Sequence, residues 1–533
     1  MREKSVLSWR LSSLATPSSK LVWLVVTLVF ASGLIALGAS NWVSSSGNNF
    51  WVWSSSNFSP DERFQSMDSK VVVGNQGDRA IFDASPDDLS SSPAPAPAPA
   101  PAPSPSPSPT PSAVEETILE IAGTNTSGVK NIISRNESGS FPMRLERKHG
   151  KLQKLEAGLA QARAAIREAR KNGNQTEDPD YLPTGPMYWN ANAFHRSYLE
   201  MEKQFKVFVY EDGEPPIFHN GPCKSIYAME GNFIYHMEVT QFRTTDPDNA
   251  HVFFLPFSVA AIVTFIYEPN SHNWAPMKRT VRDYVNLIAG KYQYWNRSLG
   301  ADHVMLSCHD WGPELSSSAP HLRKNSIRAL CNANTSEGFN PAKDVSFPEI
   351  FLADGTMRHL LGGPSPSKRP ILAFFAGGVH GPVRPILLEH WENKDEDVQV
   401  HRYLPKGVSY YEMLRKSRFC ICPSGYEVAS PRIVEALYTG CVPVLINDHY
   451  VAPFSDVLNW KRFSVEIPVK DIPNLKKILM GISQRQYIRL QRRGRQMRRH
   501  FEVNLPPKRF DVFHMVLHSI WLRRLNVRLN PQP

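Results

Sequence analysis

Two opposite charges, Arg432 and Glu435, stand three positions apart behind a loop of Ser, Gly and Pro residues. An arginine in the first turn of a helix can bind a phosphate through two hydrogen bonds, and a glutamate one turn further can accept hydrogen bonds from ribose hydroxyls. Ser424 and Gly425, in the preceding loop, let a ligand approach the backbone closely. Together these residues would hold a nucleoside diphosphate. The alternative is a solvent-exposed Arg–Glu pair, which stabilises a helix by only a few tenths of a kcal/mol.

The stretch around this pair, CICPSGYEVASPRIVEALYTGCVPVLI (420–446), has the pattern of a strand, a loop, a short helix and a second strand. Ser430 is a suitable N-cap, Pro431 suits the first helical position, and Gly440 is a typical helix end. Ligands of parallel α/β sheets bind beyond the carboxyl ends of the strands. We therefore expect the loop at 423–429 to face the ligand.

A second loop of the same kind, GGVHGPVRP, follows the predicted strand at 371–376. It contributes Gly378, which opens the chain, and Arg384, close to a helix start. It lacks the GxGxxG pattern of dinucleotide-binding loops. Two such loops at strand ends of one domain nevertheless support one phosphate site.

Strands and helices alternate from residue 181 onward, which predicts parallel sheets with helices on both faces. We expect an N-terminal Rossmann-like domain at 181–365 and a C-terminal one at 366–533, separated by a hinge at 361–370 and facing a cleft. The last strong helix is predicted at 510–524, FDVFHMVLHSIWLRR, and it carries one apolar stripe. The predicted strands lie at 205–210, 251–257 and 303–307 in the first domain, and at 371–376, 418–422, 441–446 and 462–467 in the second.

The N-terminal part predicts a membrane anchor. Residues 21–39 are uncharged and long enough to span a bilayer, and basic residues precede them. Residues 1–20 would then be a cytosolic tail, and everything beyond the span would be lumenal. A cleaved signal peptide is the competing interpretation, but its apolar core is normally shorter.

A stem follows at 40–143, poor in core-forming residues and rich in Pro and Ser. Its end at 93–112 has proline at every second position and should form an extended polyproline II spacer. A stem helix is expected at 144–180, with leucines near a seven-residue repeat. This helix either forms a coiled-coil homodimer or packs against its own domain.

Sequons and cysteines agree with a lumenal location. The candidate glycosylation sites are Asn125, Asn136, Asn174, Asn296 and Asn334. The six cysteines could form disulfides, with fifteen possible full pairings among which the sequence does not choose. The formal net charge is +10, yet no nucleic-acid-binding pattern accompanies it. The basic run at 489–501 fits a solvated helix face, and anionic lipid or an anionic acceptor is the alternative partner.

The chain resembles the plant exostosin-like glycosyltransferases of family 47. The resemblance covers about residues 181–528 and rests on several motifs in the family's order. These are DPDNAHVFFLPF, YWNRSLGADHVMLSCHDWG, KDVSFPE, FFAGGVHGPVRP and FCICPSGYEVASPRIVEALYTGCVPVLINDHYVAPFSDVLNW.

The resemblance implies the two-domain GT-B fold, a single-pass type II protein of the Golgi membrane, and inverting transfer from a nucleotide sugar, with a UDP-sugar expected. It also implies that the second domain holds the donor, with Arg432 at the diphosphate and Glu435 at the ribose. Gly378, Arg384, Ser424 and Gly425 would line the donor site.

Inverting transfer needs a base for the acceptor hydroxyl. CHDWG, after a strand of the first domain, offers His309 and Asp310, and Glu427 in the donor loop is a rival. Alternatively, the His–Asp pair only orders a buried loop beside Trp311. We expect no essential metal and no cofactor, because the Asp-x-Asp at 246–248 precedes its strand and fits a turn.

The sequence thus predicts a Golgi transferase that acts on a plant cell-wall polysaccharide or glycan, alone or in a complex with other transferases. A non-catalytic, membrane-tethered protein that binds cell-wall glycans is the alternative.

Overall fold

The computed structural model describes residues 141–173 and 177–529, with side chains from residue 150 onward. The predicted tail, membrane span and nearly all of the stem lie outside these ranges. Within them, no helix combines the length and apolarity that crossing a bilayer requires. The predicted stem helix is present as α3, which spans Phe141–Asn172.

The first sheet has six parallel strands in the order β2-β1-β3-β4-β5-β6. The strands are β1 (Val207–Val209), β2 (Arg243–Thr244), β3 (Val252–Phe254), β4 (His303–Ser307), β5 (Ile327–Leu330) and β6 (Val345–Ser346). The helices are α4 (Ala191–Gln204), α5 (Ala228–Val239), α6 (Val259–Ile266), α7 (Ala275–Lys291), α8 (Gln293–Ser298), α9 (Gly312–Ser316) and α10 (Pro320–Lys324), with 3-10 turns η1 (Pro247–Asn249) and η2 (Thr335–Glu337).

Alternate strand residues fill different cores, because successive side chains of a strand point to opposite faces. Val207 and Val209 pack with α4 and α5, whereas Phe208 packs with α6 to α10 on the other face. Both faces of this sheet are therefore covered, as the uninterrupted apolar runs predicted.

The second sheet has five parallel strands in the order β11-β10-β9-β7-β8. They are β7 (Ile371–Ala376), β8 (Val398–His401), β9 (Ser417–Pro423), β10 (Val442–Ile446) and β11 (Val465–Glu466). The helices are α11 (Val383–Trp391), α12 (Tyr410–Lys416), α13 (Arg432–Thr439), α14 (Leu475–Met480), α15 (Gln484–Met497) and α16 (Val512–Asn526), with 3-10 turns η3 (Pro366–Lys368), η4 (Trp460–Arg462), η5 (Val469–Asn474) and η6 (Arg498–Phe501).

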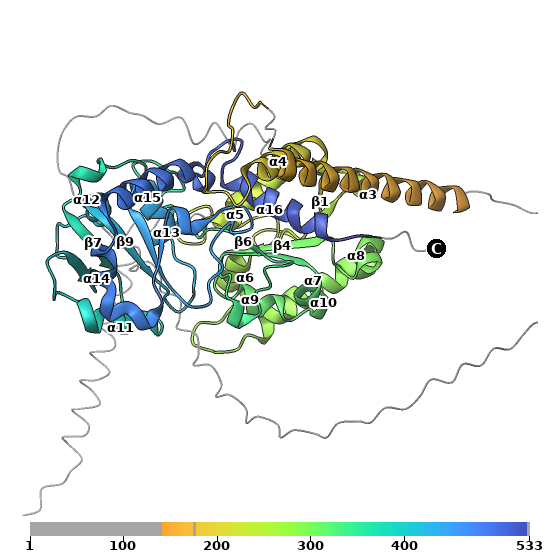
Figure 1. Ribbon diagram of the computed structural model, residues 1–533. Helices are drawn as coiled ribbons and strands as arrows, with labels where there is room; N and C mark the ends of the chain where they lie inside the picture. Colours follow the sequence, from red (N-terminus) through yellow and green to blue (C-terminus); the bar gives the residue numbers. More distant parts are fainter. Residues whose placement is uncertain (1–140, 174–176, 530–533) are drawn as a thin grey trace, which may run out of the picture. The chain divides into compact units, whose positions relative to one another are not determined.

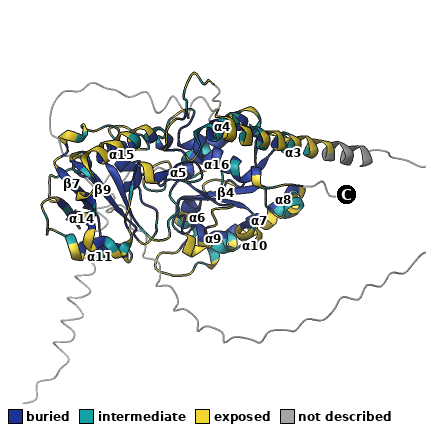
Figure 2. Cartoon of the chain, in the orientation of Figure 1, coloured by how far each residue is buried: buried dark blue, intermediate teal, exposed yellow. Residues whose placement is uncertain are grey.

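One apolar core joins the two sheets. It contains Leu306 from β4, Leu445 from β10 and Leu437 from α13. Figure 2 shows the strands in the buried colour, under helices whose outer faces are exposed. The carboxyl-end loops of the two sheets are therefore held by shared packing.

Helix α16 lies in the second half of the sequence but packs against α4, β5 and β6 of the first sheet (Figure 1). It is buried on every side, with His518 and Ser519 as deeply covered as its apolar stripe. A single boundary at 365/366 thus separates the strands of the two sheets. It assigns α16 to the second domain by sequence, although this helix packs against the first sheet.

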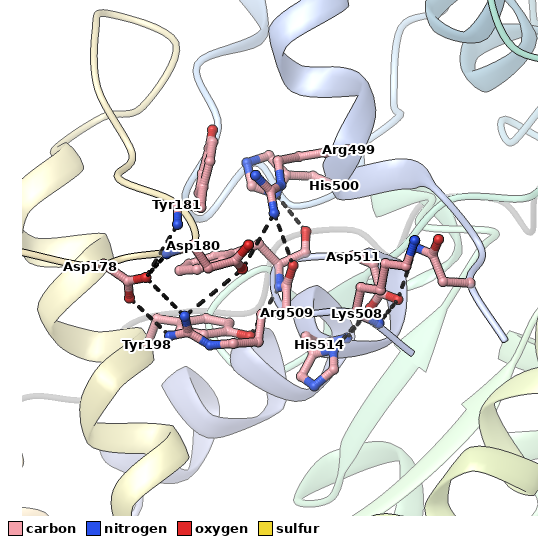
Figure 3. A network of polar contacts seen from close by, with 12 residues as sticks. Asp178, Asp180, Tyr181, Tyr198, Arg499, His500, Lys508, Arg509, Asp511 and His514 are labelled. Carbon is pink, nitrogen blue, oxygen red and sulfur yellow. Dashed lines mark hydrogen bonds and ion pairs between the residues drawn. The ribbon is translucent and has the colours of Figure 1, made fainter. Parts of the chain in front are cut away.

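A polar network ties the segment before α4 to the segment before α16 (Figure 3). Arg509 donates to both carboxylate oxygens of Asp178 at 2.9 Å, and to Glu202 on α4. Arg499 lies over the ring of Tyr181, 4.0 Å from its centroid. These charge-assisted bonds hold the start of the first domain against the end of the chain.

Two disulfides are present, Cys308–Cys331 and Cys420–Cys441. The first joins the ends of β4 and β5, and the second joins neighbouring strands of the second sheet. Cys422 is buried and free, and Cys223 is exposed and free.

Helix α3 packs on α4 of its own domain, and Leu159 is completely buried there. This contact corresponds to the second of the two alternatives for the leucine repeat, a helix packed on its own domain.

Candidate active site

Polar side chains follow three neighbouring strands of the first sheet, at their carboxyl ends. Asp310 comes three residues after β4, Asn332 two residues after β5, and Glu349 three residues after β6. Parallel strands bring their carboxyl ends to one edge, so these groups meet there. Tyr227, at the start of α5, adds a hydroxyl hydrogen-bonded to Asp310.

The loop after β9 brings Glu427 to the same place. Asn332 Nδ2 donates to Glu427 at 2.5 Å and to Glu337 at 3.0 Å. It also donates to the backbone oxygen of Asp310 at 3.2 Å. One amide therefore connects carboxylates of the two sheets.

Burial and mutual repulsion raise the pKa values of these carboxyls. The pKa of Asp310 rises to about 7, through burial and the charge of Glu337. The pKa of Glu427 rises to about 9, through burial and the nearby Asp310 and Glu337. The pKa of Glu349 is well above its usual value, although Arg432 and another arginine lower it. At neutral pH Glu427 is therefore protonated and Asp310 is near half ionisation.

Two arginines of the second sheet lie on the other side of this cluster. Arg384 and Arg432 are buried, and each guanidinium lies over the ring of Phe375, at 5.9 Å and 5.2 Å from its centroid. Arg384 Nη1 donates to Gly378 O, and Arg432 Nη2 donates to Ala376 O. Their charges act on Glu349.

The two predicted donor loops touch each other. Gly381 has φ +65°, and a Cβ there would lie 1.8 Å from the carbonyl oxygen of Gly425. A Cβ on Gly425 would in turn lie 3.0 Å from Arg384 Nη2. Ser424 is buried beside them. The glycines are needed for backbone contact, which brings Gly378, Arg384, Ser424 and Gly425 into one wall.

The helix behind the loop starts one residue later than expected. Pro431 is the N-cap, and no side chain caps the helix. Ser430 Oγ instead accepts a hydrogen bond from Arg432 Nη1. The N-cap prediction for Ser430 is wrong because its hydroxyl orients the arginine, whereas Gly440 ends the helix at φ +72° as expected.

Glu435 is 2% exposed and Arg432 is 4% exposed, so the solvent-exposed pair is ruled out. Tyr410 Oη donates to Glu435 Oε2 at 2.9 Å, and Tyr411 Oη donates to Oε1 at 3.2 Å. A buried carboxylate fixed in this way is oriented rather than mobile.

His309 is ordered by its own loop. Its Nδ1 accepts the backbone N–H of Trp311 at 3.1 Å, its ring lies against Tyr227, and burial lowers its pKa to about 3. The buried carboxylate of Glu230 accepts the N–H groups of Cys308 and His309. This loop therefore holds Asp310 in place, with its side chain mostly covered but still in part exposed to solvent.

The Exostosin GT47 domain family matches residues 201–482, which carry all of these loops. The chain belongs to the exostosin GT47 family. It is 65% identical over 406 residues to a probable glycosyltransferase of Arabidopsis thaliana, covering 76% of this chain and 78% of that one. It is 28% identical to a probable glucuronoxylan glucuronosyltransferase of the same plant, covering 63% and 77%.

A probable beta-1,4-xylosyltransferase of Arabidopsis thaliana is likewise 28% identical, covering 60% of this chain and 81% of its own. The solved structure of TarM covers 44% of this chain and 57% of its own at 12% identity, with a TM-score of 0.26, too low to carry an argument about fold. The family and these relatives establish the GT47 chain as a glycosyltransferase.

Two of the predicted glycosylation sites of this GT47 chain fall within the described residues. Asn296 is exposed on α8, and its Nδ2 donates to the backbone oxygen of Ala289 at 2.8 Å. Asn334 is 8% exposed, and its Nδ2 donates to Glu337 at 2.8 Å, so the nitrogen that would carry a glycan is already engaged. Asn125, Asn136 and Asn174 lie outside the described residues.

No group of three or more His, Cys, Asp or Glu side chains suited to a metal ion occurs in the described part of the GT47 chain. The Asp-x-Asp letters at 246–248 form a capped turn, in which Asp246 accepts the N–H of Asp248. Tyr294 donates to Asp248 at 2.7 Å. Both aspartates therefore have structural partners.

Sequence reasoning missed four members of this GT47 site: Glu349, Asn332, Tyr227 and Glu337. Glu349 and Asn332 each closely follow a strand of a parallel sheet, which is a usable signal only where that strand has been predicted. The strands themselves, β5 and β6, were not predicted, so the rule had nothing to act on.

Proposed function

We propose that this glycosyltransferase moves a sugar, with inversion, from a UDP-sugar to a plant cell-wall polysaccharide or glycan. The observation that carries the proposal is that carboxyl groups and buried arginines come together at the candidate site. Carboxyls follow the strands of the first sheet, and the buried Arg384 and Arg432 follow the strands of the second. A GT-B arrangement places acceptor and donor on such facing walls.

The donor diphosphate would lie against the second sheet. Arg384 and Arg432, with the N–H groups at the start of α13, would bind it and stabilise the charge that develops as it leaves. Glu435, already fixed by two tyrosines, would accept the ribose hydroxyls. In this proposal the arginines supply the positive charge, and no metal or other cofactor is needed.

Asp310 is the proposed base among the three candidates. Its carboxylate would take the proton of the acceptor hydroxyl as that oxygen attacks the anomeric carbon, and the nucleoside diphosphate would leave from the opposite face. A base with a pKa near the working pH suits this task. His309 is held by its loop, and Glu427 is protonated at neutral pH.

The proposal includes a single-pass type II protein of the Golgi membrane with this domain in the lumen. Its support is the uncharged run at 21–39 with basic residues before it. We expect a fluorescent fusion of the protein to colocalise with a Golgi marker. We also expect its C-terminus to be protected from protease in sealed vesicles. A cytosolic C-terminus would overturn it.

A donor screen on the full chain tests the chemistry. Sugar transfer from UDP-sugars to cell-wall oligosaccharides should survive EDTA and fall strongly in Arg432→Gln and Glu435→Gln. Arg485→Gln, an exposed arginine on α15, is the matched control and should stay active. UDP at a hundredfold its Kd should stabilise the protein by about 2.7 kcal/mol, and Arg432→Gln should lose most of this gain. Transfer from GDP-sugars only would refute the proposal that the donor is a UDP-sugar. Loss of transfer in EDTA would refute the proposal that no metal is needed.

A further inference from the structure

A basic groove lies on the second sheet's domain, away from the candidate active site. Its volume is about 850 Å³, within the usual range of ligand-binding pockets. It is formed by η4, β11, η5, α14 and α15, and we call it the α14–α15 groove. Four of its lining residues precede or begin β11, namely Lys461, Arg462, Ser464 and Val465, whereas the donor loops follow the carboxyl ends of β7 and β9. In a parallel sheet these are opposite edges.

Five cations line this groove against a single carboxylate, Asp471. The cations are Lys461, Arg462, Lys477, Arg489 and Arg493. Across residues 141–173 and 177–529, none of these five forms an ion pair with a carboxylate.

The three arginines are close enough to repel one another. The pKa of Arg493 is lowered, mainly by burial and to a smaller extent by the charges of Arg489 and Arg462. Arg493 Nη1 also reaches the backbone oxygen of Arg462, at 3.4 Å. Arg489 and Arg493 stand four positions apart on α15, a like-charge spacing that destabilises a helix by a few tenths of a kcal/mol. An anion bound between these arginines would be attracted to each of them, and this attraction would offset their mutual repulsion.

The groove is amphipathic rather than only charged. Val465, Ile478, Ile482 and Leu490 are partly buried in the core of the second sheet, and they also line the groove between the cations. Apolar side chains of this kind suit the C–H faces of sugar rings. Guanidinium groups suit carboxylates, which they bind with two parallel hydrogen bonds.

We propose that the α14–α15 groove binds a carboxylate-bearing oligosaccharide, a uronic-acid chain, remote from the site of transfer. The concave shape and mixed lining fit a narrow chain with regularly spaced anions. This proposal goes beyond the proposed transferase function and does not depend on which donor the active site uses.

The test is binding of the full chain to immobilised oligogalacturonate, with its methyl-esterified form as the uncharged ligand control. The double variant Arg489→Gln/Arg493→Gln should weaken binding roughly tenfold or more, since charge-assisted hydrogen bonds are lost. Arg492→Gln/Arg495→Gln removes equal charge from exposed positions of the same helix that do not line the groove, and should bind like the parent. Binding should weaken as salt rises.

Three results would overturn the proposal. One is equal weakening in both double variants, and another is equal binding of the methyl ester. The third is binding to phosphatidylserine vesicles with none to oligogalacturonate. The assay needs no turnover, and UDP stabilisation measured on the same variants reports the donor site separately.

Discussion

The pH dependence of sugar transfer tests the assignment of Asp310 most directly. The base must be ionised to accept a proton, so kcat/KM should rise with pH and level off above the pKa of about 7. Each pH unit below that value lowers the ionised fraction tenfold. At pH 5 the rate should therefore be about a hundredth of its plateau.

Two neighbours should move this midpoint in opposite directions. Tyr227 hydrogen-bonds the Asp310 carboxylate and lowers its pKa, so Tyr227→Phe should move the midpoint up. Glu337 raises the pKa of Asp310 by its charge, so Glu337→Gln should move the midpoint down. A hydrogen bond contributes about 1 kcal/mol, which corresponds to a shift of about 0.7 pKa units.

The assay is initial-rate transfer at subsaturating acceptor across pH 5 to 9, about two units either side of the pKa. Far-ultraviolet circular dichroism at each pH verifies that the protein stays folded. Asp310→Asn should lower the plateau by about 10²- to 10⁴-fold. An acid limb that persists in Asp310→Asn, or a midpoint that shifts the same way in both neighbour variants, would refute the reasoning.

Three further substitutions test the fold. Arg509→Ala removes both guanidinium hydrogen bonds from the buried carboxylate of Asp178, which keeps His195 and two backbone N–H groups as partners. The substitution should lower the free energy of unfolding by about 2–3 kcal/mol. Arg509 holds the pKa of Asp178 well below its usual value, so this loss is fully present above pH ~4, the unfolded pKa, and should shrink as the pH falls and Asp178 protonates. An equal loss at low pH in urea titrations would contradict this. Arg328→Met should cost about 3–5 kcal/mol, because Asp344 remains buried with only part of its neutralising charge; a Tm within a degree or two of the parent would speak against it. Cys331→Ser opens a disulfide loop and should lower the free energy of unfolding by about 2–4 kcal/mol relative to the oxidised parent; the reduced parent is the control and should show a similar loss.

The strongest strands were predictable from the sequence because their central residues are apolar. The predicted strand at 303–307 coincides with β4, and that at 371–376 with β7. β5 was missed because Arg328 interrupts its apolar pattern. That arginine is buried only because Asp344 pairs with it from a loop sixteen residues away, a contact that no local pattern reveals.

The candidate donor residues were predictable for a similar local reason. Gly425, Arg432 and Glu435 lie on one strand–loop–helix unit, and local spacing predicts a common site for them. The carboxyl cluster was not predictable in the same way. Asn332 and Glu427 are 95 positions apart and meet only when both sheets are folded, so their hydrogen bond is a product of tertiary structure.

Helix α16 has a consequence for how the chain is made. The strands of the first sheet are complete once Ser346 has been synthesised, yet the helix that covers β5 and β6 ends at Asn526. At translation rates of about 5–20 residues per second, the ribosome needs on the order of ten seconds or more to deliver it. Until then the part of that face over β5 and β6 stays uncovered, and we expect the nascent protein to need chaperones. A premature stop codon near the end of the reading frame would accordingly damage the half of the enzyme that was made first.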